Sequence, residues 1–336
     1  AVRNMPRFLP VNVKAVNMAE GGASMAQEIG FSFSNALCLL DEALKRGLDI
    51  DEVAPKFSFF GCSTTHLFEE IAKWRAARRL WAKIMHGKYG AKKPASMAFK
   101  FTGFHNPLWL YSEEPELNLV RAAMGALACA LGGTQAMPHP GLDEAYAIPT
   151  EKSQRLALGT QQILAEETNI TKTVDPLGGS YYIEWLTNRI EQEIAEKMKE
   201  VEKRGGAIYT IKDGFMQRDI FEFFREQQEA IATGKRVVVR KNKYQIDEEE
   251  AISERIELHH PDDRAIEEHI ENLRKIKARR DDRKVRGCLD TIKKTARGKE
   301  NLMPYLIEAA KAYVSIGEIT GALKEVWGEY KEPRVI

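Results

Sequence analysis

Residues 55–85 read PKFSFFGCSTTHLFEEIAKWRAARRLWAKIM, a short apolar run followed directly by a long amphipathic pattern. The run FSFF at 57–60 has the length and aromatic content of a buried strand. One stripe of the helix that follows comprises Leu67, Ile71, Trp74, Arg78, Trp81 and Met85. The charged positions off this stripe are Glu69, Glu70, Lys73 and Arg75. A strand joined at once to such a helix predicts a βα unit of a parallel sheet.

The flanking sequence repeats this alternation of strand and helix. Strand patterns occur at 11–15, VNVKA, and at 97–104, MAFKFTGF. Helices are predicted over 117–131, where a Gly-Gly pair gives a stop, and over 151–169, after a Pro-Thr start signal. This alternation predicts an α/β fold with a parallel sheet, of the (β/α)8 barrel type.

Beyond about residue 185 the sequence changes to long, highly charged helical patterns such as EQEIAEKMKEVEKRGG. We therefore expect two regions, a barrel segment over 1–185 and a helical extension over 186–336. A barrel cannot close with about half of its strands, because open sheet edges would be exposed. We expect the remaining strands to come from a separate segment.

The composition excludes several classes of protein. Lys+Arg 50 against Asp+Glu 49 in 336 residues leaves a net charge of +1, which gives no electrostatic case for a nucleic-acid or membrane-surface partner. No apolar run approaches the roughly 18 residues of a membrane span. The four cysteines lie far apart, which favours reduced thiols in a cytoplasmic protein, and no histidine spacing predicts a metal site.

In parallel barrels the functional groups lie at the carboxyl ends of the strands. The stretches with polar side chains near those ends are 14–17, 60–63, 100–105 and 135–144. These positions predict a site on one side of the sheet. They do not identify its chemistry, since no Walker A loop, G-x-G-x-x-G or G-x-S-x-G motif occurs.

Three blocks of the sequence resemble methylmalonyl-CoA mutase and its adenosylcobalamin-dependent acyl-CoA mutase relatives. They are residues 55–85, residues 132–164, GGTQAMPHPGLDEAYAIPTEKSQRLALGTQQIL, and residues 173–187, TVDPLGGSYYIEWLT. The resemblance implies the later part of a substrate barrel with its helical linker. It also implies a radical 1,2-carbon-skeleton rearrangement of an acyl-CoA, with adenosylcobalamin as cofactor. The cobalamin-binding domain, with its D-x-H-x-x-G motif, is then expected on a partner subunit, which makes the protein a hetero-oligomer.

The resemblance implies roles for single residues as well. Lys56, Ser58 and Phe60 match the stretch P-R-L-S-F-F that binds the CoA tail, with Lys56 in place of the family's Arg. Lys100, at the start of KFTGFHNP, is expected to join them in binding substrate. The cofactor-facing residues implied are Gln135, Pro140, Glu144 and Ala145, of which Pro140 replaces an Asn.

Other positions depart from the family pattern. Val16 and Asn17 stand where the family has a Tyr-His pair that touches the rearranging substrate. Thr102 and Phe104 stand where a His and a Gln grip the substrate near its thioester. Asn17, Thr102 and Phe104 therefore occupy the catalytic positions, and Val16 lies beside the substrate.

These departures leave two interpretations. In the first, Phe104, Val16, Trp109 and Phe101 widen an apolar pocket, so that the enzyme rearranges a bulkier or aromatic acyl group and not methylmalonyl-CoA. In the second, the chain is a non-catalytic subunit that scaffolds a catalytic partner. Loss of the substrate contacts favours the second interpretation, whereas retention of Gln135, Glu144 and the CoA-binding stretch favours the enzyme.

Overall fold

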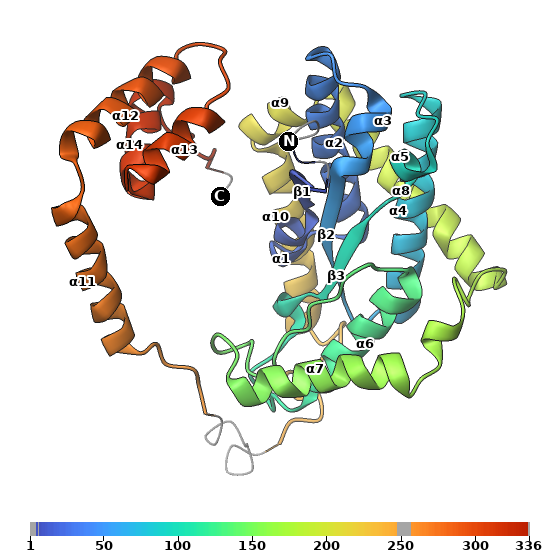
Figure 1. Ribbon diagram of the computed structural model, residues 1–336. Helices are drawn as coiled ribbons and strands as arrows, with labels where there is room; N and C mark the ends of the chain where they lie inside the picture. Colours follow the sequence, from blue (N-terminus) through green and yellow to red (C-terminus); the bar gives the residue numbers. More distant parts are fainter. Residues whose placement is uncertain (1–4, 6, 247–256, 335–336) are drawn as a thin grey trace. The chain divides into compact units, whose positions relative to one another are not determined.

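The computed structural model describes residues 5, 7–246 and 257–334 (Figure 1). By its contacts the chain divides into two compact units, residues 1–259 with 333–336, and residues 260–332. The predicted boundary near residue 185 falls inside a helix of the first unit. The assignment of 186–336 as a linker stays a prediction.

Three parallel strands form the sheet, in the order β1-β2-β3. They are β1 (Val11–Lys14), β2 (Phe57–Ser63) and β3 (Phe101–His105). On the far side of β3, Thr102 forms a parallel bridge with Ala136. All three predicted strands are therefore present, although β3 starts at Phe101 and not at Met97, which ends a short helix. The α/β class is confirmed, a parallel sheet of barrel type followed by a helical extension.

Helices α2, α4 and α6 cover one face of the sheet, and α8 packs against α2 and α4 (Figure 1). In chain order the helices of this unit are α1 (Ala15–Glu20), α2 (Met25–Lys45), α3 (Ile50–Val53), α4 (Leu67–Gly87), α5 (Pro94–Met97), α6 (Leu117–Gly132), α7 (Glu151–Glu166), α8 (Tyr181–Lys203), α9 (Ala207–Lys212) and α10 (Phe215–Ala232). The helix predicted after FSFF and those predicted over 117–131 and 151–169 are confirmed as α4, α6 and α7, and the charged helical pattern that starts at residue 191 begins within α8. Helix α6 ends where predicted, at Gly133, whose φ of 85° lies in the left-handed region.

The second unit is entirely helical. It consists of α11 (Asp263–Arg279), α12 (Asp282–Ala296), α13 (Met303–Lys311) and α14 (Ile316–Trp327). Val285, Ile292 and Val314 belong to its own small core, so this unit buries apolar surface independently of the sheet. In the described part of the chain, no helix is both long enough and apolar enough to cross a membrane.

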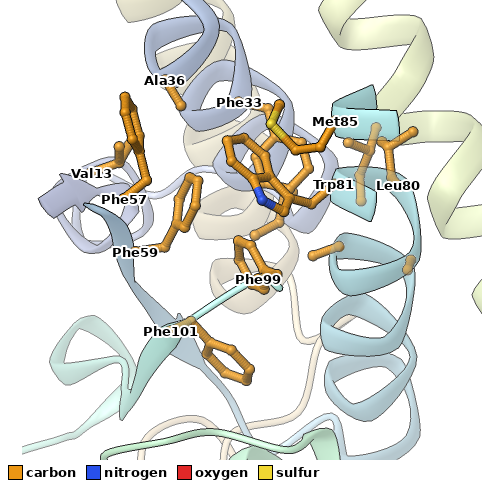
Figure 2. Packing of buried hydrophobic residues seen from close by; sticks show 14 of the residues in the cluster. Val13, Phe33, Ala36, Phe57, Phe59, Leu80, Trp81, Met85, Phe99 and Phe101 are labelled. Atoms are coloured by element: carbon orange, nitrogen blue, oxygen red, sulfur yellow. The ribbon is translucent and has the colours of Figure 1, made fainter. Parts of the chain in front are cut away.

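Aromatic packing between the sheet and its helices forms the main core (Figure 2). The ring centroid of Phe59 on β2 lies 5.0 Å from that of Trp81 on α4 and 5.5 Å from that of Phe33 on α2. On β3, Phe101 stacks on Trp74 of α4 with centroids 4.3 Å apart. Because neighbouring residues of a strand point to opposite faces, this packing turns the alternate side chains of β2 and β3 toward the other face of the sheet.

Two of the charged residues that lie off the apolar stripe of α4, Glu70 and Lys73, are buried. The Lys73 ammonium donates a hydrogen bond to Glu28 of α2 at 2.8 Å and lies 2.6 Å from a carboxylate oxygen of Glu70. It also donates to the backbone carbonyl of Cys62, at the end of β2. A helical stripe read from α4 alone could not show that α2 brings a second carboxylate to this position.

The backbone of β2 is tied into the same buried cluster. The N–H groups of Cys62 and Thr64 donate to Glu28 and Glu70, at 2.7 and 3.0 Å. Burial raises the pKa of Glu28. Burial would lower the pKa of Lys73, but its two carboxylate neighbours outweigh that effect and raise it. Lys73 is therefore a cation that fixes the carboxyl end of β2 to two helices.

We predict that Lys73→Met lowers the free energy of unfolding by about 3–5 kcal/mol, because two buried carboxylates lose their cation while the apolar stem is kept. Urea unfolding followed by circular dichroism measures the change. Arg46→Met is the matched control, since Arg46 pairs with Glu42 at the surface, where their side chains are 75% and 53% exposed. The control should cost about 0.5 kcal/mol or less. A loss as small for Lys73→Met would contradict the role given to the buried cluster.

Candidate functional site

The face of the sheet turned away from α2, α4 and α6, called the inner face below, gathers several predicted site residues. Phe60 on β2 lies between Lys14 on β1 and Thr102 on β3, in one row across the three strands. Phe104 comes next on this face, and its ring meets that of Phe60 edge-on with centroids 6.1 Å apart. The buried residues Val16, Ala19 and Cys62 complete an apolar cluster with these two rings. Val16, Phe60, Thr102 and Phe104 are thus brought together.

A second group lies at the amino-terminal ends of β2 and β3. Lys56 ends the short turn that precedes β2. The Ser58 hydroxyl accepts a hydrogen bond from the Asn12 side chain at 3.0 Å and donates to the Val11 carbonyl at 3.2 Å. The Lys100 ammonium donates to the Pro55 carbonyl at 2.8 Å. Two cations and a hydroxyl therefore lie at the end of the sheet opposite to the apolar cluster.

The cofactor-facing residues implied by the sequence do not lie together. The Gln135 side chain accepts from the Phe101 N–H at 2.6 Å and donates to the Gly133 carbonyl at 2.8 Å, at the amino-terminal end of β3. The chain then runs parallel to β3 through Ala136 toward the carboxyl ends of the strands. Pro140 is buried beyond that point, Glu144 is half-buried and Ala145 is exposed. Gln135 therefore joins backbone segments at one end, whereas Glu144 lies near the other.

Two carboxylates, Glu144 and Glu20, interact electrostatically near the carboxyl ends of the strands. Burial raises the pKa of Glu144, and the charges of Asp143 and Glu20 raise it further. Burial also raises the pKa of Glu20, at the end of α1. Asn17, one turn before Glu20, is exposed. Sequence reasoning misses Glu20, although it stands in KAVNMAEGG, the stretch whose family counterpart S-G-Y-H-M-Q-E-A-G also carries a Glu.

One residue expected to widen the pocket lies elsewhere, so the prediction was wrong for that residue. Phe101 points to the helix-covered face, where it stacks on Trp74. Trp109 packs with Ile231 and Val238 and also lines a cavity with Ala19 and Cys62 of the apolar cluster. Strand parity explains Phe101, since it alternates with Thr102 and Phe104 and must face the other way.

A pair of buried histidines lies behind the carboxyl end of β3. His105 is 1% exposed, and neither ring nitrogen has a hydrogen-bond partner among the described residues. Its ring lies against α6 at Gly125, where an added Cβ would come within 2.2 Å of Nδ1. Burial lowers the pKa of His105 to about 3, helped by the charges of His139 and Arg121. Burial also lowers the pKa of His139.

The buried His105 predicts a stability that falls in acid. Between the ordinary histidine pKa of about 6.5 and the folded value of about 3, the unfolded chain binds the proton and the folded chain does not. The free energy of unfolding therefore rises with pH across this window. The stability that this difference in proton binding contributes is lost as the pH falls through the window. His105→Gln should reduce the difference in unfolding free energy between pH 7 and pH 5 by about 1–2 kcal/mol. Urea unfolding at the two pH values measures it, and His269→Gln in the exposed helix α11 is the control. An equal pH dependence in both variants would contradict the assignment.

Comparisons with known proteins agree on one family. The family model described as methylmalonyl-CoA mutase matches residues 1–329. The large subunit of 2-hydroxyisobutanoyl-CoA mutase from Aquincola tertiaricarbonis is 40% identical over 336 residues, 100% of this chain and 59% of that protein. Methylmalonyl-CoA mutase from Rhizobium meliloti is 36% identical over 330 residues, and the human mitochondrial one 35% over 331. Each of these covers 98% of the chain, against 46% and 44% of the relative. The chain thus spans about half the length of the curated relatives it matches.

Proposed function

The chain belongs to the methylmalonyl-CoA mutase family, and we propose that it is the substrate-binding part of an adenosylcobalamin-dependent acyl-CoA mutase. The reaction is an isomerisation in which a group migrates between adjacent carbons of the acyl chain. The observation that carries this proposal is the inner face of the sheet, with cations at one end and an apolar cluster at the other. An acyl-CoA has the same order, a phosphate-bearing tail and an apolar acyl end.

We propose that Lys56, Ser58 and Lys100 bind the CoA tail at the amino-terminal end of the sheet. Ammonium groups suit phosphate oxygens, although Lys lacks the planar fork of Arg. The apolar cluster of Val16, Phe60, Cys62 and Phe104 then receives the acyl group and keeps water away from it.

Residues near the carboxyl ends of the strands suit the nucleoside part of the cofactor. Glu20 and Glu144 are partly desolvated carboxylates, which accept hydrogen bonds from sugar hydroxyls well. We propose that these two residues and Asn17 hold that part, with Pro140 and Ala145 beside it. When bound, adenosylcobalamin supplies a carbon radical by homolysis of its cobalt–carbon bond. The chain's own contribution is to position the acyl-CoA and exclude water.

The partner that we propose is a cobalamin-binding subunit. The relative from Aquincola tertiaricarbonis is named a large subunit, which supports a division of the mutase into separate chains. The helical unit of residues 260–332 has its own core and suits a connecting element.

The position of the CoA tail can be tested by binding. Lys56→Glu should weaken acyl-CoA binding by about tenfold or more, because one charge-assisted contact is worth about 1.5–3 kcal/mol. Isothermal titration calorimetry with butanoyl-CoA measures it. Lys45→Glu, on the exposed end of α2, is the charge-matched control. An unchanged affinity for Lys56→Glu would overturn the assignment of the CoA tail.

The acyl group can be tested by turnover. Asn17, Thr102 and Phe104 replace side chains that grip a polar substrate, and a carboxylate buried without a partner is costly. An apolar acyl group instead gains about 25 cal/mol per Å² of surface buried. The complete complex with cofactor should convert branched or aromatic acyl-CoAs in preference to methylmalonyl-CoA. Robust conversion of methylmalonyl-CoA would refute this preference. The loss of the family's substrate contacts at these positions also favours one alternative, a non-catalytic scaffolding subunit, which absence of any conversion would support.

A further inference from the structure

Lys14 places a cation on the inner face of the sheet, in a row with two candidate site residues. It is the last residue of β1 and lies opposite Phe60, which in turn lies opposite Thr102. Among the described residues no carboxylate forms an ion pair with Lys14. Its ammonium lies 4.6 Å from the centroid of the Phe60 ring. The Lys14 side chain thus extends from β1 over the Phe60 ring of the neighbouring strand β2.

The row that contains Lys14 separates the two ends of the site. Ser58, in the group proposed to bind the CoA tail, lies two residues earlier on β2, about 7 Å along the strand. Val16, Cys62 and Phe104 lie beyond the row, toward the carboxyl ends of the strands, and form the apolar cluster with Phe60. A ligand with its tail at Ser58 and its acyl chain in the cluster must pass Lys14 at the bond that joins the two parts.

In an acyl-CoA that junction is a thioester, whose carbonyl oxygen accepts hydrogen bonds. Thr102 has a shorter side chain than the His that it replaces, so the row needs another donor. The Lys14 ammonium carries three N–H donors on a flexible stem. Contact with the face of Phe60 holds such a cation without consuming its donors.

We propose that Lys14 is a specificity-determining residue whose ammonium donates a hydrogen bond to the thioester carbonyl oxygen of the acyl-CoA. This inference rests on the proposed acyl-CoA site and names the group within it that selects thioesters. The acyl chain beyond the thioester then contacts only the apolar cluster and not the Lys14 ammonium. This arrangement agrees with a substrate whose acyl group carries no carboxylate. Phosphate is the poorer ligand, because the cations at Lys56 and Lys100 already lie at the tail end.

The test compares two ligands that differ only in the carbonyl group. Butanoyl-CoA is the thioester, and S-butyl-CoA is the thioether in which a methylene replaces that carbonyl. Isothermal titration calorimetry on the intact protein should give about a tenfold or greater preference for the thioester. Lys14→Met keeps the length of the side chain and should abolish the preference while leaving the affinity for S-butyl-CoA within about twofold. Lys45→Met, in the exposed last turn of α2, should keep the full preference.

The outcomes separate this inference from the function on which it rests. If neither ligand binds the unmodified protein, the acyl-CoA site itself is wrong and Lys14 has no role. If both bind but Lys14→Met retains the preference, the acyl-CoA site stands and the role of Lys14 is overturned. Lys14→Arg, checked by its melting temperature, guards against a folding defect, and because its guanidinium keeps N–H donors it should retain the preference that Lys14→Met loses.

Discussion

The buried ammonium of Lys73 is the constraint on which the candidate site depends. It links Glu28 of α2, Glu70 of α4 and the Cys62 carbonyl of β2. The two carboxylates also accept the backbone N–H groups of Cys62 in that strand and of Thr64 just after it. Buried charges are costly unless paired and hydrogen-bonded, so this cluster forms only when the two helices and the strand end meet in one arrangement. The position of Cys62, which lines the apolar cluster, is thereby fixed.

The site also follows from the parity of the strands. Phe59 and Phe101 pack into the helices, so Phe60, Thr102 and Phe104 must face the other way. A slip of one residue in β2 would exchange the two faces and bring the core aromatics into the site. The aromatic core and the buried Lys73 cluster therefore select the same register, and the inner face is a consequence of both.

Periodicity in the sequence was enough to predict the strands and helices α4, α6 and α7. The resemblance to the mutase family, and not periodicity, pointed to Phe60, Thr102 and Phe104, which lie together on one face of the sheet. The sequence also carries a start signal for α2, because Ser24 and Gln27 form a capping box. The burial of Lys73 could not be predicted, because it depends on Glu28, 45 residues away in sequence. The same holds for His105, whose burial depends on a glycine of α6, and for Gln135, whose amide is taken up by backbone groups at the opposite end of the sheet from Glu144.

The central claim is that the acyl group of an acyl-CoA lies on the inner face of β2 and β3. Photo-crosslinking with an acyl-CoA that carries a diazirine on its acyl chain, followed by peptide mapping with mass spectrometry, tests it most directly. The label should map to residues 57–63 and 101–105, and an excess of butanoyl-CoA should suppress it. Suppressible labelling confined to α8 or to residues 260–332 would contradict the claim.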